Sequence, residues 1–112
     1  MSRHVILQPR AWRDISEICD YLGQHYTSAS VEAWYEGCID AINSLARQPE
    51  RCQVARESAK LGVELRQMLY RRYRSVYRIL FVIRNEDVRV VCVRHSARDH
   101  LTPRDLPAED MP

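Results

Sequence analysis

Hydrophobic positions in the first half of the chain recur with the period of an α-helix. Val5–Leu7 is a short apolar run that predicts a strand, and Pro9 then suits the first turn of a helix, where its missing N–H costs nothing. Two helices follow, the first ending at Gly23 and the second capped by Ser28 or Ser30. We expect a helical hairpin that buries two apolar stripes, with Trp12 and Trp34 in its aromatic core. The stripes are Ala11, Trp12, Ile15, Ile18, Cys19 and Leu22, then Val31, Trp34, Tyr35, Cys38, Ile39, Ile42 and Leu45.

The pattern changes after residue 64. Residues 48–64 are polar and mixed, and they predict a connecting segment with one helical turn around Val54–Lys60. Val, Ile, Tyr and Phe then become frequent, and these residue types favour strands. We expect strands at Leu65–Arg72, Ser75–Arg84 and Asp87–His95, with tight turns at Tyr73-Arg74 and Asn85-Glu86. This order predicts an α+β fold, β-α-α-β-β-β: an N-terminal strand, a helical hairpin, and a three-stranded antiparallel meander with the hairpin on one face.

Alternation in the last two strands predicts which side chains share a face of the sheet. A two-residue turn at Asn85-Glu86 places one set under the helices: Tyr77, Ile79, Phe81, Ile83, Val88, Val90, Cys92 and Arg94. The other face then holds Arg78, Leu80, Val82, Arg89, Val91, Val93 and His95. We expect this second face to be partly open and positively charged. A register shift of one residue would exchange the two faces.

Composition excludes several classes of protein. Of the 112 residues, 46% are hydrophobic and 29% charged, which suits one folded domain and not a disordered chain. We expect a domain at 1–100 and a flexible tail at 101–112. The longest apolar run, Ile79–Ile83, is too short to cross a bilayer, and no signal peptide follows Met1, so we expect a cytoplasmic protein with no membrane partner. The cysteines lack the spacing of zinc ligands, and we expect free thiols with no metal and no cofactor.

The net charge of +2 conceals an uneven distribution. Residues 66–98 contain nine Arg against Glu86 and Asp87, whereas residues 1–65 carry more acids than bases. Arg forms bidentate hydrogen bonds with phosphate and carboxylate, so this block predicts a surface for nucleic acid or an acidic protein. The residues that we assign to this target surface are Arg71, Arg72, Arg74 and Arg94.

These features together resemble the RelE/ParE superfamily of bacterial toxins from type II toxin–antitoxin modules. The resemblance spans roughly residues 3–100 and is sharpest in three stretches: 62–66 (GVELR), 77–81 (YRILF) and 91–95 (VCVRH), with Tyr73-Arg74 and Arg98. It implies a growth-inhibiting toxin, similar to plasmid stabilisation proteins, that a cognate antitoxin binds in a hetero-oligomeric complex.

The resemblance implies one of two activities. RelE-like members cleave mRNA in the ribosomal A site, whereas ParE-like members lack the nuclease residues and inhibit DNA gyrase. Cleavage by the 2′-hydroxyl needs a proton acceptor, a proton donor and cations. For that chemistry the resemblance implies Arg66, Arg78, His95 and Arg98 as catalytic residues. No Tyr follows Tyr77, and this absence favours a ParE-like gyrase inhibitor that is not an enzyme, with a RelE-like endoribonuclease as the alternative.

The same residues also have purely structural interpretations. His95 can hydrogen-bond a backbone carbonyl, and Arg78 can pair with Glu86 or Asp87. Arg66 can pair with Glu64 or with an acidic residue of a helix. The charge pattern also suits a nucleic-acid-binding module without toxicity, or a degenerate toxin that only binds its antitoxin.

An antitoxin segment that is disordered when free can fold on the toxin. We expect it to lay an apolar helix along the hairpin, at Trp34, Tyr35 and Ile42, and a strand against the sheet edge. Its acidic side chains would then meet the Arg-rich block.

Overall fold

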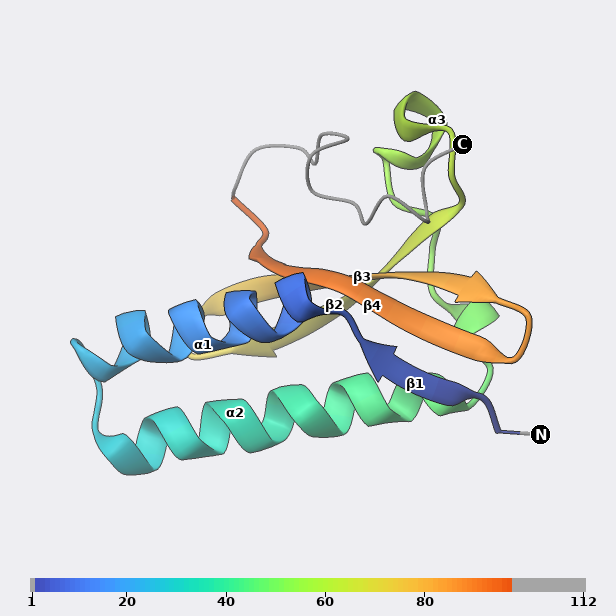
Figure 1. Cartoon of the computed structure of the whole chain (residues 1–112). Coiled ribbons are helices and arrows are strands. Elements are labelled where there is room, and N and C mark those ends of the chain that lie inside the picture. The colour runs from blue at the N-terminus through green and yellow to red at the C-terminus, as the bar shows by residue number, and fades with distance from the viewer. Residues whose placement is uncertain (1, 98–112) are drawn as a thin grey trace.

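The computed structural model describes residues 2–97 and confirms the expected order of elements (Figure 1). Arg98 and the expected tail at 101–112 lie outside the described residues. The main elements are β1 (His4–Leu7), α1 (Pro9–Gly23), α2 (Ser28–Asn43), β2 (Leu65–Arg72), β3 (Ser75–Arg84) and β4 (Asp87–His95). The connection from α2 to β2 contains the 3-10 turns η1 (Ser44–Ala46) and η2 (Pro49–Arg51) and the short helix α3 (Ser58–Leu61). The last three strands have the predicted bounds.

The strands form one mixed sheet in the order β1-β4-β3-β2. β2, β3 and β4 are antiparallel neighbours, and β1 runs parallel to the first half of β4. The turns at Tyr73-Arg74 and Asn85-Glu86 form as predicted, and Tyr73, Arg74 and Asn85 adopt the positive φ that tight hairpin turns use. Figure 1 shows α1 and α2 together on one side of the sheet, with α3 on the other side.

The main core lies between the helical hairpin and the sheet. Trp34 is fully buried at its centre and meets the rings of Tyr70 and Tyr77 edge-on, with centroids 5.6 and 5.1 Å away. Trp12, which we expected in this core, is 46% exposed. The neighbouring Ala11 faces the sheet, and successive helical residues point about 100° apart, so Trp12 is turned towards solvent. The cap of α2 is also one residue earlier than expected: the Thr27 hydroxyl accepts a hydrogen bond from the Ser30 N–H at 3.1 Å.

A β-bulge interrupts β4. Leu80 of β3 pairs with Cys92, whereas the next residue, Phe81, pairs with Val90. Val91 is therefore an extra residue on β4, and the alternation of side chains shifts by one position beyond it.

The bulge overturns the predicted faces for the end of β4. Val93 and His95 lie opposite Ile79 and Tyr77, on the side of the sheet that the hairpin covers. Cys92 joins the opposite face, and Arg94 pairs across the strands with Arg78 on that same side. The prediction that placed Cys92 and Arg94 under the helices, and Val93 and His95 opposite them, is therefore wrong.

The α1 helix takes the place of a strand beside the second half of β4. β1 ends at Leu7, which pairs with Val90. Beyond that point the buried Asp14 side chain of α1 accepts a hydrogen bond from the Val93 N–H at 3.0 Å. Its other carboxylate oxygen accepts one from the Arg10 side chain at 2.9 Å. The carboxylate thus satisfies a backbone donor that β1 is too short to reach.

The second face of the sheet is covered over β3 and β4 by the segment that precedes β2. A smaller core forms there from Ala55, Leu61, Leu65, Leu80, Val82, Val91 and Cys92. Val54 also bridges to Arg66, so residues 53–55 extend the sheet beside the start of β2. This cover closes the part of the face that bears Leu80, Val82, Val91 and Cys92, on the face that we expected to be partly open and positively charged.

Close packing joins α2 to β2. The Tyr70 hydroxyl donates a hydrogen bond to the Trp34 carbonyl of α2 at 2.9 Å. Gly37 makes room for it, since a Cβ at this position would overlap the hydroxyl and lie 3.1 Å from the ring carbon that carries it. Burial, the largest cause, raises the pKa of Tyr70 above its ordinary value, so the hydroxyl stays a donor at neutral pH.

Gly37→Ala is expected to lower the free energy of unfolding by about 1–3 kcal/mol, because the added methyl group displaces Tyr70 from α2. Gly23→Ala is the matched control: a Cβ there meets nothing within 4 Å, and stability should hold or rise slightly. Urea denaturation of both variants tests this. Adding Tyr70→Phe to Gly37→Ala should restore part of the loss, and equal stabilities for the two Ala variants would contradict the account.

Candidate functional site

A groove of about 630 Å³ lies between the end of the helical hairpin and the ends of β2, β3 and β4. We call it the aromatic groove, because its lining includes Tyr21, His25, Tyr26, Trp34, Arg72, Tyr73, Tyr77, Arg94 and His95. Tyr, Trp and Arg are enriched among residues that dominate protein interfaces, and aromatic rings also stack on unpaired bases. The groove is thus a candidate binding site.

The β2–β3 turn forms one wall of the aromatic groove. Tyr73 stacks on Tyr26 of the α1–α2 connection, with ring centroids 5.4 Å apart and planes 19° from parallel. Its hydroxyl donates a hydrogen bond to the Ser30 carbonyl at 3.2 Å. The Arg72 guanidinium lies 5.3 Å from the Tyr73 ring centre, within cation–π range. These contacts hold the turn against the hairpin.

Tyr77 and His95 form the other wall. Their rings meet edge-on, with centroids 5.3 Å apart at 79°. Burial raises the pKa of Tyr77 above its ordinary value. The Ala97 N–H donates to His95 Nδ1 at 3.1 Å, so the neutral imidazole carries its proton on Nε2. His95 therefore accepts from a backbone N–H, where we had considered a bond to a carbonyl.

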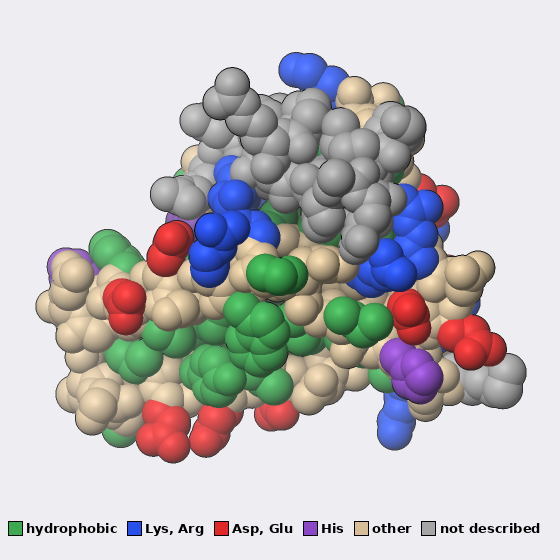
Figure 2. All heavy atoms as spheres, in the orientation of Figure 1, with side chains coloured by type: hydrophobic (Ala, Val, Ile, Leu, Met, Phe, Trp, Pro, Cys, Tyr) green, Lys and Arg blue, Asp and Glu red, His purple; other side chains and the backbone are tan. Residues whose placement is uncertain are grey.

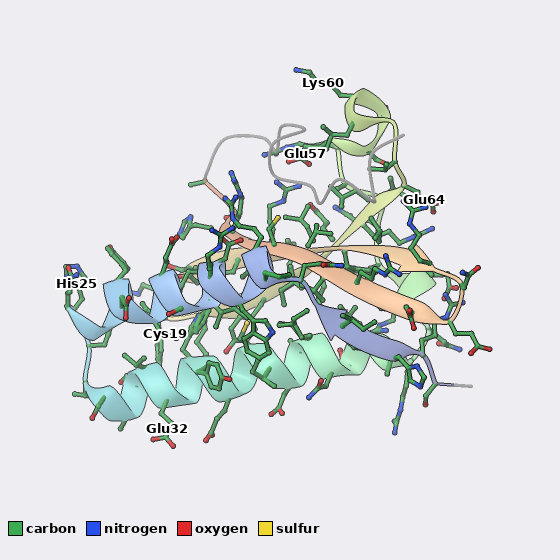
Figure 3. The ribbon with its side chains drawn as sticks, in the orientation of Figure 1. Cys19, His25, Glu32, Glu57, Lys60 and Glu64 are labelled. Atoms are coloured by element: carbon green, nitrogen blue, oxygen red, sulfur yellow. The ribbon has the colours of Figure 1, made fainter. Side chains whose placement is uncertain are left out.

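Arg78 is almost fully buried in an ion pair. It is 4% exposed, and its two terminal nitrogens donate to the Glu57 carboxylate at 2.8 and 2.6 Å. Its Nε donates to the Gln67 side chain at 2.8 Å. We had considered Glu86 or Asp87 as the partner of Arg78, and neither of them is. The pair anchors the segment that bears α3 to the sheet, and Figure 3 shows Glu57 beside α3.

Arg66 has a structural role as well. It pairs with Glu64 at 2.6 Å, which confirms the structural alternative for this residue. It also donates to the carbonyls of Glu50 and Cys52 at 3.1 and 2.6 Å. These bonds hold the connecting segment against the start of β2.

Among the described residues, the structure does not bring together Arg66, Arg78 and His95, three of the four implied for nuclease chemistry. Arg78 lies on the face of the sheet opposite to His95. Arg66 pairs with Phe81 and His95 with Tyr77, which places them four residues apart along β3, roughly 13 Å at strand spacing. Arg98, the remaining member, lies outside the described residues.

The arginines assigned to a target surface gather at one end of the sheet. Arg72 is the last residue of β2 and Arg74 lies in the β2–β3 turn, and Arg71 precedes them on β2 with an exposed side chain. Arg71 and Val76 pair across the strands and line a groove of about 420 Å³ on the face opposite the hairpin. Arg94 borders the aromatic groove.

The residues expected to meet an antitoxin differ in exposure. Trp34 and Ile42 are fully buried in the main core, so their side chains do not reach the surface. Tyr35 is 39% exposed. It lines an apolar hollow of about 440 Å³ between α1 and α2, together with Cys19 and Val31. We call this the hairpin groove.

Within residues 2–97, no group of three His, Cys, Asp or Glu side chains is placed to hold a metal ion. The cysteines at 19, 38, 52 and 92 are free thiols, and burial raises the pKa of Cys38 to about 12. No helix in the described part of the chain has the length and apolar character needed to cross a membrane.

A strand, a helical hairpin on one face and three further strands in one open sheet make this an α+β protein with the ParE-like fold. The family model described as ParE toxin of type II toxin-antitoxin system, parDE, matches residues 5–100. The chain therefore belongs to the ParE toxin family, which confirms the resemblance.

A solved structure described as the chromosomal ParDE TA system from P. aeruginosa has a similar fold. The TM-score is 0.67 at 13% sequence identity, covering 84% of this chain and 96% of that chain. A search of curated protein sequences finds no match.

The Arg78–Glu57 pair yields a prediction about stability. Arg78→Met should lower the free energy of unfolding by about 3–5 kcal/mol, because the Glu57 carboxylate stays buried and loses both hydrogen bonds from Arg78. Glu57→Leu combined with Arg78→Met removes both charges and should recover most of that loss. Chemical denaturation of the single and double variants measures the difference; a double variant no more stable than Arg78→Met would refute the assignment.

Proposed function

We propose that this chain is the toxin of a type II module, that it inhibits DNA gyrase by binding without turnover, and that a cognate antitoxin neutralises it. Membership of the ParE family carries the proposal. The separation of Arg66, Arg78 and His95 supports it, because ribonuclease chemistry needs its cations and its proton donor around one phosphate.

The target surface in this proposal is the end of the sheet around the β2–β3 turn. Cations are supplied there by Arg71, Arg72 and Arg74. The aromatic groove beside them supplies rings whose side chains lose little conformational entropy on binding. Arg94 extends the surface along β4. A protein that presents acidic side chains and an apolar anchor would fit this combination.

We propose that an antitoxin strand pairs with the outer edge of β2. Residues 53–55 already bond to the Leu65 carbonyl and the Gln67 N–H. The next residues with the same orientation are Leu69 and Arg71, because alternate residues of a strand share an edge. Leu69 is exposed and lies beside Arg71 in the 420 Å³ groove, which suits a strand that alternates apolar and acidic residues.

A helix of the antitoxin would fill the hairpin groove in the same proposal. Tyr35 and Tyr26 are exposed aromatic residues that line this groove. Trp34 and Ile42 belong to the core beneath it, against which Cys19 and Val31 pack. The antitoxin strand at the β2 edge and the antitoxin helix in the hairpin groove would contact opposite parts of the toxin. One antitoxin segment can supply both only if it wraps around the toxin.

The purified chain should inhibit DNA supercoiling by gyrase and leave mRNA uncleaved in a translation reaction. His95→Gln should keep part of the inhibition, because binding needs no proton transfer and only the contacts of one ring of the aromatic groove are lost. Arg72→Gln combined with Arg74→Gln should weaken it by about tenfold, the effect of losing two or three exposed ion pairs. Supercoiling assays over a range of toxin concentrations measure each effect.

Arg13→Gln combined with Arg47→Gln is the matched control for charge, since both side chains are exposed away from the turn, on α1 and after η1. Cleavage of mRNA that His95→Gln abolishes would instead establish a RelE-like nuclease. Equal losses of inhibition from this double control and from the double turn variant would show that only net charge matters.

The toxin–antitoxin complex should weaken as salt is added and still survive at high salt. Salt screens the pairs between antitoxin acids and Arg71, while the apolar contacts at Leu69 and Tyr35 persist. Isothermal titration at low and high ionic strength tests this with full-length partners. Complete dissociation at moderate salt would contradict the apolar part of the binding mode.

A further inference from the structure

The hairpin groove runs between α1 and α2, and its floor is apolar. Cys19, Val31 and Tyr35 line it, and Gly23 leaves space at its end. Trp12 lies on the same stripe of α1, since residues 12, 19 and 23 repeat at helical spacing. Its indole is exposed. Figure 2 shows hydrophobic side chains gathered over this part of the molecule, and Figure 3 shows Cys19 between the two helices.

One rim of the groove includes an acidic residue, Glu32, which begins a row of carboxylates along α2. Glu32, Glu36 and Asp40 follow each other at intervals of four residues along α2, next to Tyr35. All three are exposed, and within residues 2–97 no basic side chain pairs with them. Figure 2 shows acidic side chains along the edge of the hydrophobic area, and Figure 3 shows Glu32 on the side of α2 away from α1.

We infer that the antitoxin segment in the hairpin groove is an amphipathic helix with Lys or Arg on the flank beside Glu32, Glu36 and Asp40. This inference rests on the proposed function, and it specifies the chemistry of the partner. An acidic flank would meet three carboxylates of the same sign, whereas a basic flank forms an ion pair at each turn. The segment therefore differs in charge from the acidic strand proposed for the β2 edge.

A second copy of the chain is a poorer occupant. In a two-fold dimer the same surface meets itself, so Glu32, Glu36 and Asp40 would approach their own counterparts. Like charges at such an interface oppose association. The acidic rim thus favours a different chain with basic side chains.

The test compares charge reversals on the rim and elsewhere, with the full chain and its full-length antitoxin. Glu36→Arg should weaken the complex by about tenfold, because one attraction becomes a repulsion. Glu86→Arg is the matched control: its side chain is exposed in the β3–β4 turn, and the net charge changes equally. Tyr35→Ser reports separately whether the groove is occupied. Titration of each variant with antitoxin at two salt concentrations measures the affinity of the complex. Sedimentation of the chain alone reports whether it forms a dimer.

The possible outcomes separate the two proposals. A larger loss for Glu36→Arg than for Glu86→Arg, which shrinks at high salt, supports the inference. Equal effects of the two reversals overturn it, and if antitoxin still binds, the proposed function stands. An antitoxin that does not bind the unaltered chain contradicts the proposed function itself. A dimer of the chain alone that Tyr35→Ser dissociates assigns the groove to a second copy and also overturns the inference.

Discussion

The hydrogen bond from the Val93 N–H to Asp14 fixes helix α1 beside the second half of β4, the last strand of the sheet. β1 is too short to pair with the second half of β4, and a buried backbone donor left without a partner costs about 1–3 kcal/mol. The Asp14 carboxylate meets that need from α1 and is itself held by Arg10. The helix is thereby fixed along the edge of β4, and the aromatic groove opens between its far end and Tyr77.

The pattern of the sequence predicts the elements well and the faces of β4 poorly, for a definable reason. Periodicity and turn residues locate the three strands of the second half at their observed bounds. The register beyond Val90 depends on one inserted residue, and the stretch from Val90 to Val93 is apolar throughout. Four apolar residues in a row show no alternation, so the bulge at Val91 leaves no trace in the pattern. The side of the sheet that His95 occupies follows from that bulge alone.

The candidate site was predictable only in part, and Arg78 explains why. An arginine inside an apolar strand needs a buried acidic partner, which is a signal that the sequence does contain. Several acids were available, and Glu57 lies 21 residues away in a segment with no regular pattern. Tertiary packing selects the partner, as it also selects Trp34 over Trp12 for the core. Arginine clustering located the turn surface but could not separate the exposed Arg74 from the buried Arg78.

The distribution of charge that results has a consequence for specificity. Arg66 and Arg78 are engaged in structural pairs, whereas Arg71 and Arg74 are exposed at the turn end of the sheet. Glu32 and its two acidic neighbours lie on the outer side of α2, so the molecule presents cations and anions on separate surfaces. A chain that wraps both must change the sign of its charge along its length. A partner of uniform charge would gain affinity at one surface and lose affinity at the other. This difference discriminates among apolar helices and strands that are otherwise similar.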